Sequence, residues 1–311
     1  MTQRAGGVNR ARTDRPVDAA PLLRHFRKRF PFAIPGVVAY GAFIIVPVIL
    51  SLYYSFTNRS LLSPDADFVG LDNYERLVTD SRFLDTFAFT LILTVVTLVG
   101  VNVLGLAIAV LLNQVGRLFY AMRMLFFIPV ALLLVIVAFL WSTILTDNGI
   151  LNTMLRETGL GALATSWLGT PTMAQVSVIL VSGWQGMSLA VVIYLAGLQT
   201  VPTTLYDAAK IDGAGRWSAF RYVTWPFLAG ALTINSTLLL INGFKSYDIP
   251  VVLTATGPGH ATSMIATEVI RVGFKLTRAG LASAMAIVMV VVAAAVTLTI
   301  VGLLQRREVD V

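Results

Sequence analysis

The segment LQTVPTTLYDAAKIDGAGRWSAFRYVTWP, residues 198–226, lies between two long apolar stretches and decides how the chain is interpreted. Pro202 suits the first turn of a helix, and residues 205–211 are expected to form that helix. Gly213 should end it, because glycine readily leaves the helical conformation. Residues 216–223 should then form a second short helix. The segment is therefore predicted to be a helical elbow outside the apolar stretches.

Before and after this elbow, the sequence consists largely of long stretches without Asp, Glu, Lys or Arg. The composition is 57% hydrophobic and 13% charged, whereas soluble domains carry about 25% charged residues, so a soluble globular domain is excluded. A bilayer core needs ~20 apolar residues as a helix, and six stretches are long enough. The predicted spans lie near residues 33–56, 86–112, 124–145, 174–199, 224–244 and 279–304.

A seventh uncharged stretch, residues 249–267, contains Pro250, Gly257, Pro258 and Gly259. Proline and glycine at these positions would leave backbone groups unpaired in lipid, so this stretch is expected to be a loop. The sequence thus predicts an all-α membrane protein. Its transmembrane domain should cover residues 32–306, with short tails at 1–31 and 307–311.

The distribution of basic residues predicts the orientation in the membrane. Six spans place both termini on one side, and that side carries 15 Lys/Arg against 8 on the other. By the positive-inside rule both tails are expected in the cytoplasm of a bacterial inner membrane. The net charge of +7 is concentrated in the tail 1–31, which is expected to contact anionic headgroups and not nucleic acid.

Several classes of activity lack the residues they require. The chain has no cysteine, and its two histidines, His25 and His260, fall on opposite sides of the predicted membrane. No Gly-Lys dipeptide occurs, so a phosphate-binding P-loop is absent. No catalytic residue, metal ligand or cofactor of this chain is predicted. The spans also carry no Asp, Glu, His, Lys or Arg, which disfavours an ion-coupled secondary transporter, although Na⁺ bound by carbonyls stays open.

The elbow resembles the EAA loop of permeases of binding-protein-dependent ABC importers. The similarity rests on Asp207-Ala208-Ala209, Gly213 and Pro226, with Asp207 where the family has Glu. Two outer segments, 68–77 and 253–262, are similar to signatures of the carbohydrate permeases, including the larger permease of the maltose system. The resemblance implies a type I ABC importer permease (MetI-like) fold with six transmembrane helices.

The same resemblance implies a set of partners. These are a second homologous permease, a cytosolic ABC ATPase dimer that binds ATP and Mg²⁺, and an extracytoplasmic sugar-binding protein. The loop 200–226 would couple the permease to the ATPase. The residues predicted for that role are Asp207, Ala208, Ala209, Gly213, Trp217 and Phe220.

Polar residues within the spans are candidates for the substrate path, since such residues tend to face a cavity or another helix. Asn235, Asn242 and Ser246 fall within about 40° of one another on one helical face. Together with residues of the preceding span, 174–199, the predicted path residues are Ser182, Gln185, Gly186, Asn235, Asn242 and Ser246. Packing between helices is the alternative role for the small polar residues. Lys245, Asp248 and Glu268 are expected to meet solvent or the binding protein.

The predicted function is the permease subunit of an ATP-driven sugar importer. An ABC permease for glycerol phosphate or a related polar solute is the main alternative. An anionic cargo would require Lys or Arg on its path, and the predicted spans offer none.

Overall fold

The computed structural model describes residues 34–63 and 65–306. The predicted tails 1–31 and 307–311 lie outside the described residues. The chain divides into two compact units, Met1–Leu50 and Ser51–Val311. The described residues of the first unit belong to one helix, Ile34–Tyr54. This helix contains the π-helical turn η1 (Gly41–Ile45) and α2 (Val46–Tyr54).

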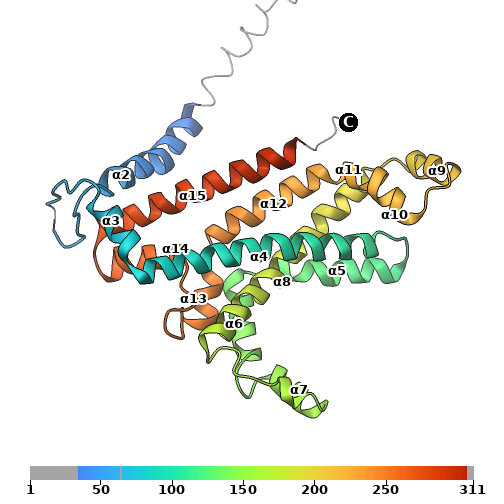
Figure 1. Ribbon diagram of the computed structural model, residues 1–311, viewed down its shortest axis with the longest axis horizontal. Helices are drawn as coiled ribbons and strands as arrows, with labels where there is room; N and C mark the ends of the chain where they lie inside the picture. Colours follow the sequence, from blue (N-terminus) through green and yellow to red (C-terminus); the bar gives the residue numbers. More distant parts are fainter. Residues whose placement is uncertain (1–33, 64, 307–311) are drawn as a thin grey trace, which may run out of the picture. The chain divides into compact units, whose positions relative to one another are not determined.

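The regular secondary structure of the second unit, in its described residues, consists of helices joined by loops, apart from an isolated bridge between Thr57 and Phe68. Its elements, labelled in Figure 1, are α3 (Asp72–Thr79), α4 (Ser81–Leu112), α5 (Arg117–Ala131), α6 (Leu134–Ile144), α7 (Ile150–Glu157), η2 (Gly161–Leu163), α8 (Pro171–Gln199), α9 (Thr203–Ile211), α10 (Arg216–Ala219), η3 (Phe220–Thr224), α11 (Trp225–Phe227), α12 (Ala229–Phe244), α13 (Asp248–Thr254), α14 (Ile265–Ile270), η4 (Arg271–Lys275) and α15 (Ala279–Gln305). The predicted all-α class is confirmed.

Four described helices are long and apolar enough to cross a membrane: Ile34–Tyr54, α4, α8 and α15. Two bent pairs raise the number to six if each pair is one crossing: α5 with α6, bent by 102°, and Arg216–Phe227 with α12, bent by 63°. The third predicted span, 124–145, is therefore not one continuous helix. Leu132 and Leu133 adopt extended backbone angles, and Pro129 just before them lacks the N–H that would support the helix.

Local signals in the sequence fix where the long helices begin. The Asp80 side chain accepts a hydrogen bond from the backbone N–H of Arg82 and so caps α4. The Thr170 hydroxyl accepts from the N–H of Met173, and Pro171 occupies the first turn of α8. Such caps satisfy backbone donors that a helix start leaves unpaired.

The prediction of a loop over 249–267 is wrong in part, because α13 and the start of α14 lie within it. Pro250 is the third residue of α13, in the first turn, where its missing N–H breaks no helical hydrogen bond. Only residues 255–264 are non-helical. Ala255, Thr256 and His260 have positive φ angles there, which turns the chain back toward α14.

The core of the second unit lies where α4, α8 and α12 pack together. Gly105 of α4 approaches Ala190 of α8 so closely that a Cβ on the glycine would lie 2.9 Å from the alanine Cβ. Tyr194 of α8, 1% exposed, fills the space between the three helices. In Figure 1 α8 crosses α4 obliquely, and α15 packs against α12.

Candidate functional site

A cavity of about 200 Å³ lies between α8 and α12, with walls from α4, α6 and α13; we call it the α8–α12 cavity. It is lined by Leu93, Thr97, Leu134, Ser182, Gln185, Gly186, Leu239, Asn242, Gly243, Lys245, Ser246, Tyr247, Asp248 and Ile249. Five of the six residues predicted for the substrate path are among them. Helical spacing on α8 and α12 thus brings side chains 60 residues apart in sequence to one cavity.

Asn235, the sixth, lies outside the cavity and is 1% exposed. Its side-chain amide donates to Oδ1 of Asn102 at 2.8 Å, and the Tyr194 hydroxyl donates to the same oxygen. The Asn102 amide in turn donates to the carbonyl of Leu98 and the hydroxyl of Ser236. These contacts join α4, α8 and α12, so the structure gives Asn235 the packing role.

Ser182 is a buried polar residue of the cavity wall whose hydroxyl lacks a hydrogen-bond partner in the described part of the chain. Its Oγ is buried, and no atom of the described residues is a hydrogen-bond partner for it. Buried polar atoms are normally bonded, and an exception calls for an explanation. Ser182 therefore brings to the cavity wall a hydroxyl whose hydrogen-bonding capacity no described residue uses.

The wall of the cavity depends on a close contact between α4 and α12. A Cβ on Gly243 would lie 2.6 Å from Oγ1 of Thr94 and 2.9 Å from its Cγ2. Thr94 is held in place because its hydroxyl donates to the carbonyl of Thr90 at 2.7 Å. Glycine is therefore required at position 243 for the two helices to approach this closely.

We expect Gly243→Ala to lower the thermal stability of the purified protein, since overpacking costs about 1–3 kcal/mol. Gly230→Ala is the matched control in the same helix, because nothing lies within 4 Å of its added Cβ. That control should leave the melting temperature unchanged or raise it, since alanine favours the helix. Equal melting temperatures for the two variants would contradict the tight packing.

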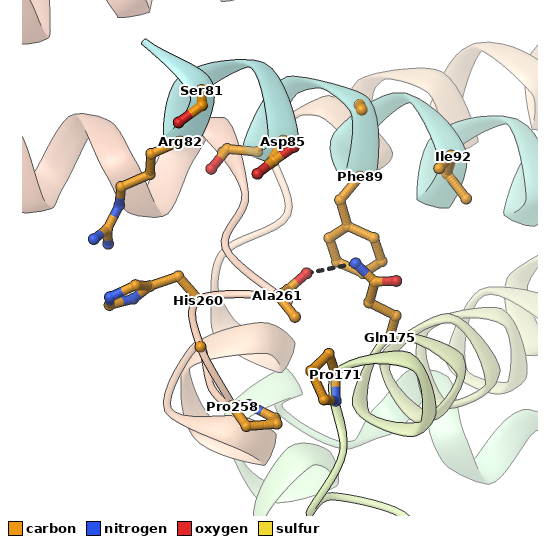
Figure 2. A pocket seen from close by; sticks show the side chains of 13 residues that line it. Ser81, Arg82, Asp85, Phe89, Ile92, Pro171, Gln175, Pro258, His260 and Ala261 are labelled. Atoms are coloured by element: carbon orange, nitrogen blue, oxygen red, sulfur yellow. Dashed lines mark hydrogen bonds between the residues drawn. The ribbon is translucent and has the colours of Figure 1, made fainter.

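A second cavity, the α4–α8 pocket of about 470 Å³, lies between the first turns of α4, the start of α8 and residues 258–261. Figure 2 shows Arg82 extending from α4 toward His260, and the Gln175 amide donating to the carbonyl of Ala261 at 2.8 Å. Asp85 also lines the pocket. None of these residues was predicted for a site, because they come from three segments whose meeting depends on the fold.

Glu268 lies beside this pocket in a buried ion cluster. Its carboxylate accepts from Arg82 at 2.8 Å and contacts Arg271 at 2.6 Å, and its side chain is 3% exposed. Burial acts to raise the pKa of Glu268, but hydrogen bonds from Arg271 and Arg82 outweigh it and hold the pKa below its ordinary value. The prediction that Glu268 meets solvent is wrong: Arg271 lies three residues away in sequence, but Arg82 and the packing that buries the carboxylate come from a distant segment.

The elbow forms the two short helices predicted for it, α9 and α10 with η3. Gly213 has φ +75°, and its N–H donates to the carbonyl of Lys210 while that of Ala214 donates to Ala209. This pair of bonds is the Schellman motif, which ends a helix at a left-handed residue and favours glycine there. Asp207 faces solvent and pairs with Lys210 at 3.2 Å.

Large apolar side chains of the elbow are exposed. Ile211 is 87% exposed, Tyr222 77% and Trp217 74%, and the rings of Trp217 and Phe220 stack with centroids 5.8 Å apart. Ala208 is exposed beside them. Exposed apolar groups next to charges make the elbow a candidate contact surface for another protein.

Comparisons with known proteins agree with this architecture. The family model "binding-protein-dependent transport system inner membrane component" matches residues 100–309. The probable starch degradation products transport system permease protein AmyD of Thermoanaerobacterium thermosulfurigenes is 32% identical, over 90% of this chain and 94% of that protein. The multiple sugar-binding transport system permease protein MsmF of Streptococcus mutans is also 32% identical, over 89% of this chain and 95% of that one.

A chain of a bacterial ABC transporter involved in the import of alginate has a similar structure. Its TM-score is 0.79 at 22% identity, and the match covers 92% of this chain and 99% of the other. The two folds are therefore similar over nearly the whole of this chain. With its bent membrane helices, its exposed elbow and this match to sequence and structure, the chain belongs to the family of inner membrane components of binding-protein-dependent transport systems.

Proposed function

We propose that this chain is the permease subunit of an ATP-driven sugar importer and that the α8–α12 cavity is part of its translocation path. The observation that carries the proposal is the lining of that cavity. Ser182, Gln185, Asn242 and Ser246 offer both donors and acceptors to sugar hydroxyls. The relatives named for starch degradation products and for multiple sugars support a carbohydrate cargo.

Coupling to ATP hydrolysis is proposed for the elbow, residues 200–226. α9 ends at a rigid Schellman turn, so it can move as one body with α10. Ala208 and Ala209 permit close approach of another chain, and Trp217 with Ile211 supplies apolar area to bury in a partner's cleft. The partner is a cytosolic ABC ATPase dimer, and ATP and Mg²⁺ bind to it and not to this chain.

The remaining partners follow from the family. A binding-protein-dependent system requires an extracytoplasmic binding protein, and we propose one that delivers sugar to the outer face. A second, homologous permease would complete the path, since this chain supplies one wall of it. Glycerol phosphate stays the alternative cargo; Lys245 lines the cavity with the positive charge that its phosphate requires, but Asp248 in the same lining offsets that charge.

Both termini are proposed to lie in the cytoplasm, on the side of the elbow. Because the chain has no cysteine, single cysteines report their side directly. Ser218→Cys should be shielded from a membrane-impermeant maleimide in intact cells, whereas Asp72→Cys and Thr158→Cys should be labelled. Labelling of Ser218→Cys from outside would overturn this orientation.

Reconstitution tests the proposed function. The chain, co-expressed with the transport proteins encoded beside it, should take up radiolabelled maltooligosaccharide or another sugar into liposomes only when ATP is enclosed in the lumen, where the ATPase of an inward-transporting complex lies. Uptake by this chain alone, driven by an ion gradient without ATP, would instead show a secondary transporter. ATP-driven uptake of glycerol phosphate but of no sugar would favour the alternative cargo.

A further inference from the structure

We propose that Lys245 and Asp248 set the charge selectivity of the α8–α12 cavity, so that it accepts neutral hydroxylated cargo and disfavours ions of either sign. This inference rests on the function proposed above, since it concerns the same cavity. It identifies two residues that determine which class of sugar can enter.

The two charges stand close in sequence at the junction of two helices. Lys245 follows the last residue of α12, and Asp248 is the first residue of α13. Both line the cavity, with Ser246 and Tyr247 between them. This junction therefore places one positive and one negative group in the same wall.

Neither charge is neutralised by a partner. The ion pairs found among residues 34–63 and 65–306 are Arg82–Glu268, Arg271–Glu268 and Lys210–Asp207. Lys245 and Asp248 thus do not pair with each other within 4.0 Å, and no side-chain hydrogen bond of the described residues involves them. Each group keeps its full hydrogen-bonding capacity for what enters the cavity.

A cavity with two opposite, separated charges carries no net formal charge, and its other polar groups, such as Asn242 and Gln185, are neutral. An ion that leaves water for such a cavity loses its hydration and meets as much repulsion as attraction. A sugar hydroxyl suits both charges, because it can donate to the Asp248 carboxylate and accept from the Lys245 ammonium. The arrangement therefore favours neutral sugars over uronates, sugar phosphates and amines.

Each charge can be removed with little change of shape. Asp248→Asn leaves Lys245 unbalanced, so the cavity becomes positive and should admit anions more readily. Lys245→Gln leaves Asp248 unbalanced and should have the opposite effect. Asp85→Asn is the matched control, because that carboxylate lines the α4–α8 pocket and not this cavity.

The test measures the electrostatic potential in the cavity with two thiol reagents of opposite charge. Ser246→Cys is introduced into the cysteine-free chain, and the assembled complex is purified in nanodiscs. The rates of modification by the anionic sulfonatoethyl and the cationic trimethylammonioethyl methanethiosulfonates are compared. One charge at ~6 Å in water changes the rate for a charged reagent roughly threefold. The ratio of anionic to cationic rates should rise by at least that factor in Asp248→Asn and fall by it in Lys245→Gln, while Asp85→Asn leaves it unchanged.

A ratio that neither substitution changes would overturn the proposal. So would a Ser246 thiol that neither reagent reaches, because the cavity would then be closed to hydrated ligands. The measurement requires no transport. A shifted ratio in a complex that takes up no sugar would therefore leave the charge assignment intact and count against the proposed function alone.

Discussion

Gly213→Pro is expected to abolish sugar uptake and substrate-stimulated ATPase activity. Position 213 has φ +75°, whereas proline is held near φ −65° and has no N–H to donate to Lys210. Both bonds of the Schellman turn are then lost, and α9 no longer ends where it does. Since the elbow is proposed to carry force from the ATPase, its displacement should uncouple the two subunits.

The measurement compares uptake and ATPase activity with the amount of chain inserted in the membrane and assembled with its partners. Gly215→Ala is the control, because Gly215 has φ −71° and nothing lies within 4 Å of an added Cβ. It should be fully active. Normal uptake by Gly213→Pro would refute the coupling role of the elbow.

Substitutions of Asp207 test the coupling role of the elbow without changing its backbone conformation. Its pair with Lys210 is exposed on both sides, so its contribution to stability is small. Asp207→Lys should therefore assemble normally and yet fail to couple, whereas Asp207→Glu, which matches the family pattern, should be tolerated.

Glu268→Gln is expected to have the largest effect on stability. Removing one partner of a buried ion pair costs about 3–5 kcal/mol; because Arg82 and Arg271 are each 28% exposed, the lower end of that range is expected. The variant would leave two guanidinium groups facing a neutral amide. Thermal unfolding of the purified protein measures the change. Glu75→Gln, at an exposed position, should melt like the parent protein.

The pH dependence of stability provides an independent test of this cluster. The folded-state pKa of Glu268 is lowered from its ordinary value of 4.5. A lowered pKa means that the cluster contributes its full stability above pH 4.5 and loses it as the pH falls through the folded-state value. The melting temperature should decrease less between pH 6 and pH 3.5 in Glu268→Gln than in the parent protein. An identical decrease would show that the carboxylate contributes nothing.

Much of this architecture could be predicted from the sequence, because it depends on signals that are local. The uncharged stretches predicted the apolar helices, and Gly213 predicted the end of α9. Asn242 and Ser246, predicted on one helical face, both line the same cavity, although α12 ends at Phe244 and Ser246 follows it.

The structure departs from the sequence-based expectations where tertiary contacts decide. Asn235 shares the helical face of Asn242, yet Asn102, 133 residues away, receives its hydrogen bond. Glu268 meets Arg82 across 186 residues, so no local pattern reveals that it is buried. The bend after Pro129 and the helix α13 around Pro250 depend on which turn of the helix the proline occupies, and hydropathy does not indicate that turn.

The central claim, that the α8–α12 cavity carries sugar, is tested most directly by uptake of Asn242→Leu, normalised to the amount of assembled complex. Each neutral hydrogen bond contributes about 0.5–1.5 kcal/mol, so the normalised uptake at limiting sugar should decrease roughly 2- to 10-fold. Basal ATPase activity and melting temperature should stay close to those of the parent. Asn102→Leu, which breaks the buried contacts with Tyr194 and Asn235, should instead lower the melting temperature and leave normalised uptake unchanged. Unaltered normalised uptake in Asn242→Leu would contradict the account.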